Sequence, residues 1–314
     1  MSHKSYIIAG PTASGKSDFA HQLAMRVGGV IINCDSVQIY RGIENISASP
    51  FADKGTGTRT RNEEPAFAEA TAGRQEQRTI DGVPYKLFSV LPLTKQISVA
   101  DYLDMARREY DAAIAAGRTP IFVGGSGYYV GVLLNGISPI PEISDENRQR
   151  ARDMVRRCPD SVRQLLPEDF KITDPQRTAR ALEVFLETGR PLSEWQSLPR
   201  RGALCPAPFK VFVNPHREIL NERIAQRIPS MMRGGAPDEA RAVIASGWDE
   251  SRAIGTSQLC RFIRGEISWE ECVQNWTTRT AQYAKRQRTW FRGQYAADVE
   301  IMHVPTAADI ESVL

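Results

Sequence analysis

The chain has 314 residues, of which 41% are hydrophobic and 25% are charged, and its formal net charge is +3. A chain of this length and composition can bury a hydrophobic core, as one large domain or two modest ones. It is therefore expected to be a globular protein. The net charge of the whole chain is too small to indicate a charged binding partner. Only local clusters of charge can indicate such a partner.

Cysteine content and hydropathy set the expected compartment. The five cysteines are scattered and form no Cys-x-x-Cys pair, so they predict reduced thiols and no zinc or redox motif. The N-terminus lacks a basic stretch followed by an apolar run, and no stretch reaches the ~18 apolar residues of a membrane span. We therefore expect a cytoplasmic protein that is neither secreted nor inserted in a membrane.

Short runs rich in Ile and Val alternate with helical periodicity in the first half of the chain. The runs lie at 6–10, 30–35 and 119–125, and the helical periodicity lies at 16–27 and 99–116. This alternation predicts an α/β fold, with a P-loop NTPase-like parallel sheet flanked by helices and functional loops at the carboxyl ends of the strands. Further strands are expected at 209–215 and 299–305.

The segment "GPTASGKS" at 10–17 matches the phosphate-loop pattern G-x-x-x-x-G-K-[ST], with a predicted strand before it and a predicted helix after it. Backbone N–H groups and the helix dipole would face a diphosphate, Lys16 would neutralise it, and Ser17 could hold Mg²⁺. The residues expected to bind the diphosphate are Gly10, Pro11, Thr12, Ala13, Ser14, Gly15, Lys16 and Ser17.

The ends of the next two strands bear on what the diphosphate is attached to. The strand at 119–125 runs into "GGSGYY" and not into the acidic residue that helps to hold Mg²⁺ in many P-loop NTPases. The strand at 30–35 runs into "DSVQIY", which places Asp35 beside the loop, with Ser36 and Gln38 nearby. Position alone allows Asp35 to be a general base, a helix cap or a Mg²⁺ partner.

Two segments depart from this core. Residues 52–78 have little apolar periodicity and are expected to form an exposed or disordered insert. Residues 137–208 are helical and charged, with a helix start at Asp174 and Pro175 and a stop at Gly189. We expect a helical insertion there, between core segments 1–136 and 209–314.

The C-terminal region predicts a basic, aromatic helix. No acidic residue occurs from Cys272 to Ala297, and at ~100° per residue Trp276, Tyr283 and Trp290 share one stripe while Lys285, Arg288 and Arg292 lie opposite. Such cations are often only a solvated face. Five more arginines lie in 147–157, and Arg177 and Arg180 are one turn apart, so the clusters together favour a polyanion such as RNA.

With these motifs in hand, the chain closely resembles the tRNA dimethylallyltransferase family, also called the tRNA isopentenyltransferase or IPP transferase family. The resemblance is carried by "GPTASGKS", "DSVQIY", "GGSGYY", "DPQRTARALEV", "REILNERIAQR" (217–227) and "TAQYAKRQRTWFR" (280–292). It implies transfer of a dimethylallyl group from dimethylallyl diphosphate to N6 of the adenosine at tRNA position 37, beside the anticodon, with Mg²⁺ assisting. ATP would then be no substrate. One chain holds a complete set of these motifs, so we expect a monomer.

The resemblance also implies roles for individual residues. Asp35 would be the general base for the adenine amine, Ser126 would contact the adenine or the phosphate, and Arg217 would assist the diphosphate. The adenine would leave its stack to reach the site. Residues implied to meet the tRNA are Asp35, Ser36, Val37, Gln38, Ser126, Arg148, Gln176, Arg177, Thr178, Ala179, Arg180, Lys285, Arg286 and Arg288.

The chain departs from the family pattern in four places, one of which is an insertion that looks shorter than usual between "RQLLPEDF" and "ITDPQR". Ser126 replaces the Thr of the usual "GGTGLY", "GVPYK" (82–86) lacks the histidines of "GVPHH", and "AIGTSQL" (253–259) lacks the usual aromatic residue. These departures bear on tRNA contacts more than on the chemistry.

Three alternatives stay open on the sequence. A P-loop small-molecule kinase would use Asp35 to activate a hydroxyl and Arg177 and Arg180 as a lid over ATP. An adenylate isopentenyltransferase would prenylate a free nucleotide, and a non-catalytic RNA-binding protein would only sense nucleotide at its loop. The basic C-terminal helix and the arginine-rich insertion favour tRNA as the acceptor.

Overall fold

The computed structural model describes all residues except 1–3, 53–77, 168–169, 171–173 and 206. The chain divides into two compact units, of which unit 1 comprises 1–133 and 205–314 and unit 2 comprises 134–204. These divisions fall a few residues from those expected at 136/137 and 208/209. Nearly all of the expected insert at 52–78 lies outside the described residues.

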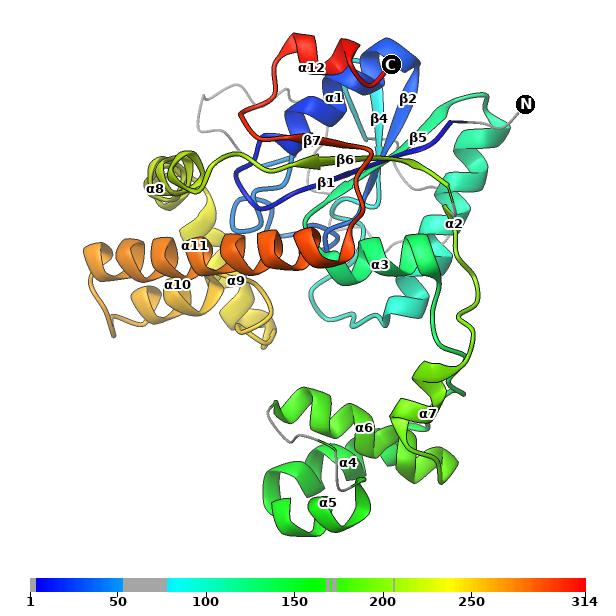
Figure 1. Ribbon diagram of the computed structural model, residues 1–314. Coiled ribbons are helices and arrows are strands. Elements are labelled where there is room, and N and C mark those ends of the chain that lie inside the picture. The colour runs from blue at the N-terminus through cyan, green and yellow to red at the C-terminus, as the bar shows by residue number, and fades with distance from the viewer. Residues whose placement is uncertain (1–3, 53–77, 168–169, 171–173, 206) are drawn as a thin grey trace. The chain divides into compact units, whose positions relative to one another are not determined.

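Unit 1 is built on a seven-stranded sheet (Figure 1). The strands are β1 (Tyr6–Ala9), β2 (Gly29–Asn33), β3 (Arg78–Ile80), β4 (Val83–Lys86), β5 (Thr119–Gly124), β6 (Phe209–Val213) and β7 (Val299–Ile301). Their order is β3-β4-β2-β5-β1-β6-β7, and only the β3–β4 pair is antiparallel. The predicted parallel α/β sheet is thus confirmed, with β1 and its loop between β5 and β6.

Helices cover both faces of the sheet, because the strand side chains alternate between two apolar layers. On one face, α1 (Lys16–Val27) and α12 (Ala307–Glu311) pack on a layer that includes Ile8 and Val211. On the other face lie α2 (Val99–Ala115), α3 (Gly127–Asn135) and α11 (Trp269–Gln294), with Phe212 contacting Phe291 at 5.6 Å between ring centroids. Because β1, β2 and β5 are parallel, their carboxyl ends lie at the same edge of the sheet.

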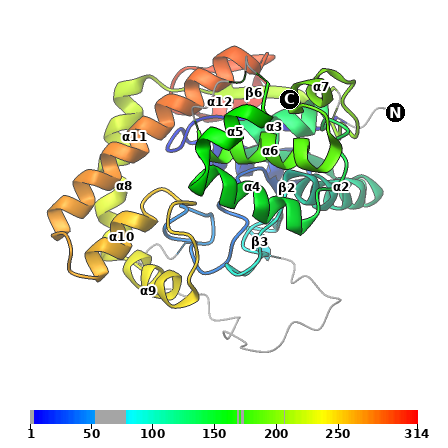
Figure 2. The same cartoon turned by 90° about the horizontal axis from the view of Figure 1, so that it is seen from below.

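The remaining helices of unit 1 form a cluster beside α11 (Figure 2). They are α8 (Arg217–Arg233), α9 (Ala236–Ser246) and α10 (Thr256–Ile263), and α8 and α10 both contact α11. Gly255 allows the close approach of α10 to α11, since a Cβ there would lie 2.1 Å from the Trp276 ring and its φ is +98°. The cluster brings α8 and α11 over the phosphate loop.

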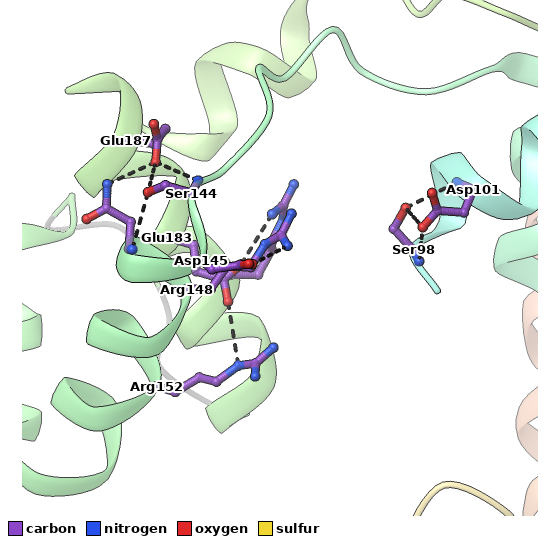
Figure 3. A network of polar contacts seen from close by, with 10 residues as sticks. Ser98, Asp101, Ser144, Asp145, Arg148, Arg152, Glu183 and Glu187 are labelled. Atoms are coloured by element: carbon purple, nitrogen blue, oxygen red, sulfur yellow. Dashed lines mark hydrogen bonds and ion pairs between the residues drawn. The ribbon is translucent and has the colours of Figure 1, made fainter. Parts of the chain in front are cut away.

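Unit 2 consists of α4 (Asp145–Arg157), α5 (Pro159–Leu165), α6 (Pro175–Thr188) and α7 (Leu192–Ser197). Its helix signals behave as the sequence predicts: the Asp174 side chain accepts from Arg177 N, and Gly189 ends α6 in the left-handed conformation. Figure 3 shows the polar contacts that join α4 to α6, in which Glu187 accepts from Ser144 and from Asn147 at 2.7–2.9 Å.

One feature of the local structure was not predicted, and one expectation was wrong. The β3–β4 hairpin was not predicted, because both strands are short and β3 is only half-buried. On α11, Lys285 and Arg292 are exposed as expected, but Arg288 is half-buried and its Nε donates to Oδ1 of the buried Asn214 at 2.8 Å. The reason is that Asn214 follows β6 on the face that α11 covers, so an acceptor lies within reach of the guanidinium.

Candidate functional site

The loop between β1 and α1 has a tightly constrained backbone. Ala13 and Gly15 have φ values of +65° and +91°, and a Cβ at Gly10 would lie 2.3 Å from the Val213 carbonyl oxygen. The first N–H groups of α1 have no acceptor within the helix, and they lie where the helix dipole favours an anion. The loop is therefore shaped to bind phosphate groups.

Three cations meet at this loop. Lys16 Nζ donates to the Pro11 carbonyl at 3.1 Å, while Arg223 Nε donates to the Ala13 carbonyl at 2.9 Å and Arg227 Nη2 to Thr12 Oγ1 at 2.8 Å. Within the described chain, Arg227 Nε is buried without a hydrogen-bond partner. A buried guanidinium with an unused donor is costly unless an anion binds there, so the arrangement fits a diphosphate.

Burial lowers the pKa of two of these cations. The pKa of Lys16 falls to about 8, mainly through desolvation; the Asp35 carboxylate opposes the shift and the Arg227 charge adds to it. The pKa of Arg227 falls to about 10 through desolvation and the neighbouring Arg223. A bound anion would stabilise the charged form of both side chains.

Asp35 lies beyond the end of β2 and lines the same cavity as Lys16. Its Oδ1 accepts from Val37 N at 2.9 Å and Gln38 N at 3.4 Å, and its own N–H donates to Asn33 Oδ1. This local turn fixes the carboxylate. Its Oδ2 has no hydrogen-bond partner among the described residues and remains able to accept a proton.

A second set of polar groups lies beside Asp35. Ser126 Oγ accepts from Ser36 N at 3.0 Å and lies 3.2 Å from Ser36 Oγ, while Gln38 Nε2 donates to the carbonyls of Ser47 and Ala48. Desolvation, followed by the Asp35 charge, raises the pKa of the Tyr283 phenol, and a hydrogen bond to Ser126 opposes that shift. These contacts join the ends of β2 and β5 to α11.

The phosphate loop, the turn at 35–38, α8 and α11 all line one cavity of about 760 Å³ within unit 1. Its polar wall contains the loop, Asp35, Arg223 and Arg227, and its apolar wall includes Met231 and Trp276. The volume suits a small ligand with a charged end and an apolar end.

The structure separates the predicted site residues into three groups. Residues 12–17 and 35–38 line the cavity, while the buried Ser126 contacts it through Ser36. Lys285 and Arg286 are exposed on α11. Arg148 and the segment 176–180 belong to unit 2, where Arg148 pairs with Asp145 and Arg180 pairs with Glu183 (Figure 3).

The arginines at the loop differ from the one that the sequence indicated. Arg217 is the exposed first residue of α8 and does not line the cavity, whereas Arg223 and Arg227 from the same helix do. Their i, i+4 spacing, which puts both on one helix face, was the available signal. Gln287 and Tyr283 were also missed, because their positions follow from the packing of α11.

Comparison with known proteins identifies the family. A family model described as IPP transferase matches residues 69–294, and one described as isopentenyl transferase matches residues 3–61. A tRNA dimethylallyltransferase of Rhodopseudomonas palustris is 36% identical over 92% of this chain and 86% of its own length, and one of Azorhizobium caulinodans is 37% identical over 92% and 88%.

The chain belongs to the tRNA dimethylallyltransferase family. Among solved structures, the full-length tRNA isopentenylpyrophosphate transferase of Bacillus halodurans matches with a TM-score of 0.63 at 25% identity, covering 99% of this chain and 94% of that one. A eukaryotic dimethylallyltransferase acting on tRNA matches with a TM-score of 0.71 at 20% identity, covering 99% and 76%, and supports the fold. As a member of the family, the chain is a prenyltransferase.

Proposed function

We propose that this tRNA dimethylallyltransferase family member transfers a dimethylallyl group from dimethylallyl diphosphate to N6 of the adenosine at tRNA position 37. The observation that carries the proposal is the juxtaposition in one cavity of a phosphate loop with three cations and a carboxylate that has an unused oxygen.

The phosphate loop and α8 supply the donor site of this proposal. Lys16, Arg223 and Arg227 neutralise the diphosphate, and the N–H groups at the start of α1 add further donors. As the bond between C1 of the prenyl group and the diphosphate oxygen breaks, negative charge grows on the leaving group. These fixed cations stabilise that charge.

Asp35 has the geometry of the base. The N6–C1 bond forms while the amine loses a proton, and Asp35 Oδ2 accepts that proton. Oδ1 stays engaged with Val37 N and Gln38 N, which holds the carboxylate in place during the transfer. Ser36 and Ser126 lie next to it and provide hydrogen-bonding groups for an adenine.

Magnesium fits the same site as a cofactor. Ser17 lines the cavity, and its hydroxyl makes no hydrogen bond within the described chain, so it is free to serve as an oxygen ligand. The described residues contain no cluster of three or more His, Cys, Asp or Glu side chains suited to a metal ion. Magnesium commonly takes few protein ligands and completes its shell with phosphate oxygens and water. When bound, Mg²⁺ would reduce the charge of the diphosphate.

An RNA acceptor is supported by charge and by family. Lys285, Arg286 and Arg292 are exposed on α11, and the five arginines of α4 lie in unit 2. The names of the related proteins specify tRNA. We assign the insertion, unit 2, to tRNA binding on these grounds.

The same reasoning supports a cytoplasmic monomer. The phosphate loop, Asp35, Arg223 and Arg227 of one chain share one cavity, so the proposed roles need no residue of a second chain. The five cysteines are free thiols, as expected in a reducing compartment. No helix of the described residues is long and apolar enough to cross a membrane.

The choice of donor distinguishes this proposal from a kinase. Purified protein is incubated with Mg²⁺ and unmodified tRNA, with either dimethylallyl diphosphate or ATP, and the tRNA is digested to nucleosides. We expect N6-prenylated adenosine only with dimethylallyl diphosphate. A third reaction contains ATP and a small hydroxyl acceptor in place of tRNA. Turnover of ATP there, with no prenylated nucleoside from the tRNA, would overturn the proposal.

A further inference from the structure

Gln287 on α11 is a buried amide whose two ends contact two different loops. Its Oε1 accepts from Thr12 N at 2.8 Å, and its Nε2 donates to the Gly125 carbonyl at 2.8 Å. Thr12 belongs to the phosphate loop after β1, and Gly125 directly precedes Ser126 after β5. One side chain, which is 5% exposed, therefore spans the donor and acceptor sides of the site.

The two loops are not tied by the sheet at this point. The pairing of β1 with β5 ends at Ala9 opposite Gly124, so the ladder stops before Thr12 and Gly125. Beyond the ladder, Gln287 of α11 connects the two loops through its side-chain hydrogen bonds. A Cβ at Gly125 would lie 2.3 Å from Nε2, so the amide occupies the space that a side chain would need there.

We propose that Gln287 is a positioning residue that sets the donor loop against the acceptor loop during prenyl transfer. The inference rests on the proposed function and adds a determinant of its geometry. Reacting atoms must be held about 3–3.5 Å apart, and a displacement of about 1 Å can cost ~10²-fold in rate. Gln287 lines the cavity, and its proposed effect on the reaction acts through its hydrogen bonds to Thr12 and Gly125.

The side-chain chemistry explains why an amide is required. The contact to Thr12 N needs an acceptor, and the contact to the Gly125 carbonyl needs a donor. Glutamine supplies one of each, ionised glutamate supplies only acceptors, and methionine of similar length supplies neither strongly. Protonated glutamic acid regains an O–H donor.

The test compares Gln287→Met and Gln287→Glu with Gln282→Met, a matched change at an exposed position of the same helix. For Gln287→Met we expect kcat to fall by ~10- to 10²-fold. The tRNA affinity should remain unchanged, and the Kd for pyrophosphate should change less than about threefold, because Lys16, Arg223 and Arg227 remain. Gln282→Met should match the wild type in all three measurements.

The pH profile of Gln287→Glu supplies a readout that a merely structural role would not move. Gln287→Met and the wild type share every other charged or titratable group that lines the cavity. These groups are Lys16, Asp18, His21, Asp35, Asp81, Tyr85, Arg223, Arg227, Arg252 and Tyr283. The ratio of kcat between Gln287→Glu and the wild type should therefore rise as pH falls from about 8 to about 6, while the ratio for Gln287→Met stays flat.

The outcomes separate this inference from the proposed function. If the wild type transfers no prenyl group, the proposed function fails. If the wild type is active and folded Gln287→Met keeps its kcat, or if Gln287→Glu shows no recovery at low pH, the positioning role is wrong. Should Gln287→Met fail to fold, the pH profile of Gln287→Glu decides alone.

Discussion

At the scale of single residues, the site contains polar groups that make fewer hydrogen bonds to the protein than they could. Asp35 uses one carboxylate oxygen for its own turn, and Arg227 has a buried Nε without a partner in the described chain. The unpaired donor is buried at Arg227, where it costs stability. The proposed substrates would satisfy it.

Asp35→Asn tests the base directly. Asparagine Oδ1 can still accept from Val37 N, so the turn should persist, but the amide cannot take a proton. We expect kcat to fall by ~10²–10⁴-fold with tRNA affinity nearly unchanged, measured by single-turnover kinetics and filter binding. A wild-type rate for this variant would refute the assignment of Asp35.

The lowered pKa of Lys16 predicts how donor binding depends on pH. Burial destabilises the ammonium form of Lys16 in the folded protein. The resulting cost in folding free energy is fully present below about pH 8, and it disappears as pH rises toward the ordinary lysine pKa of 10.5. A diphosphate binds the charged form. Pyrophosphate affinity should therefore fall above about pH 8, by up to ~10-fold per pH unit.

Titration calorimetry between about pH 7 and about pH 9 measures this dependence, with proton uptake read from buffers of different ionisation enthalpy. Lys16→Met should bind weakly at every pH and should take up no proton. Equal pH slopes for the wild type and this variant would show that Lys16 is not the titrating group.

At the scale of elements, the packing of helices positions the site residues. Gly127 and Gly131 let α3 approach Trp290 of α11, but the two positions differ in space. A Cβ at Gly127 would lie 2.4 Å from the Trp290 ring, whereas one at Gly131 would lie 3.7 Å from it. The difference offers a matched pair of variants.

We expect Gly127→Ala to lower the free energy of unfolding by ~1–3 kcal/mol through overpacking. Gly131→Ala should raise it by ~0.5–1 kcal/mol, because alanine favours a helix interior and its Cβ would make only an ordinary van der Waals contact with the Trp290 ring. Urea denaturation measures both values. Equal effects at the two positions would contradict the described packing of α3 on α11.

The elements differ in how far the sequence could predict them. The α1 helix matches its expected range, 16–27, because the loop pattern fixes its start and Gly28 its stop. The loop and Asp35 were predictable because parallel strands end at one edge. The cavity positions of Arg223, Arg227 and Gln287 were not, since they depend on how α8 and α11 pack over a loop more than 200 residues earlier.

At the scale of the whole molecule, two units contribute different properties. Unit 1 holds the complete cavity, and unit 2 is an arginine-rich helical insertion. Within unit 2, Arg177 is exposed and forms no ion pair with the described residues, while Arg180 pairs with Glu183 at 3.2 Å. Arg177 is therefore the cation more available to a phosphate.

Arg177→Ala should weaken tRNA binding and reduce its salt dependence by a slope of about 1, because one phosphate contact is lost. Arg180→Ala should have the smaller effect. Filter binding over a series of salt concentrations measures the slopes, and kcat at saturating tRNA should stay near the wild-type value. An unchanged slope for Arg177→Ala would argue against a phosphate contact there.

The acceptor provides the most direct test of the central claim, that the cavity joins a prenyl diphosphate to an adenine delivered within RNA. Three acceptors are compared with dimethylallyl diphosphate and Mg²⁺: unmodified tRNA, the same tRNA with guanosine at position 37, and free AMP. Prenyl incorporation is measured by nucleoside mass spectrometry. We predict N6-prenylated adenosine from the first acceptor alone; prenylation of AMP but not of the tRNA, or of neither, would contradict the account.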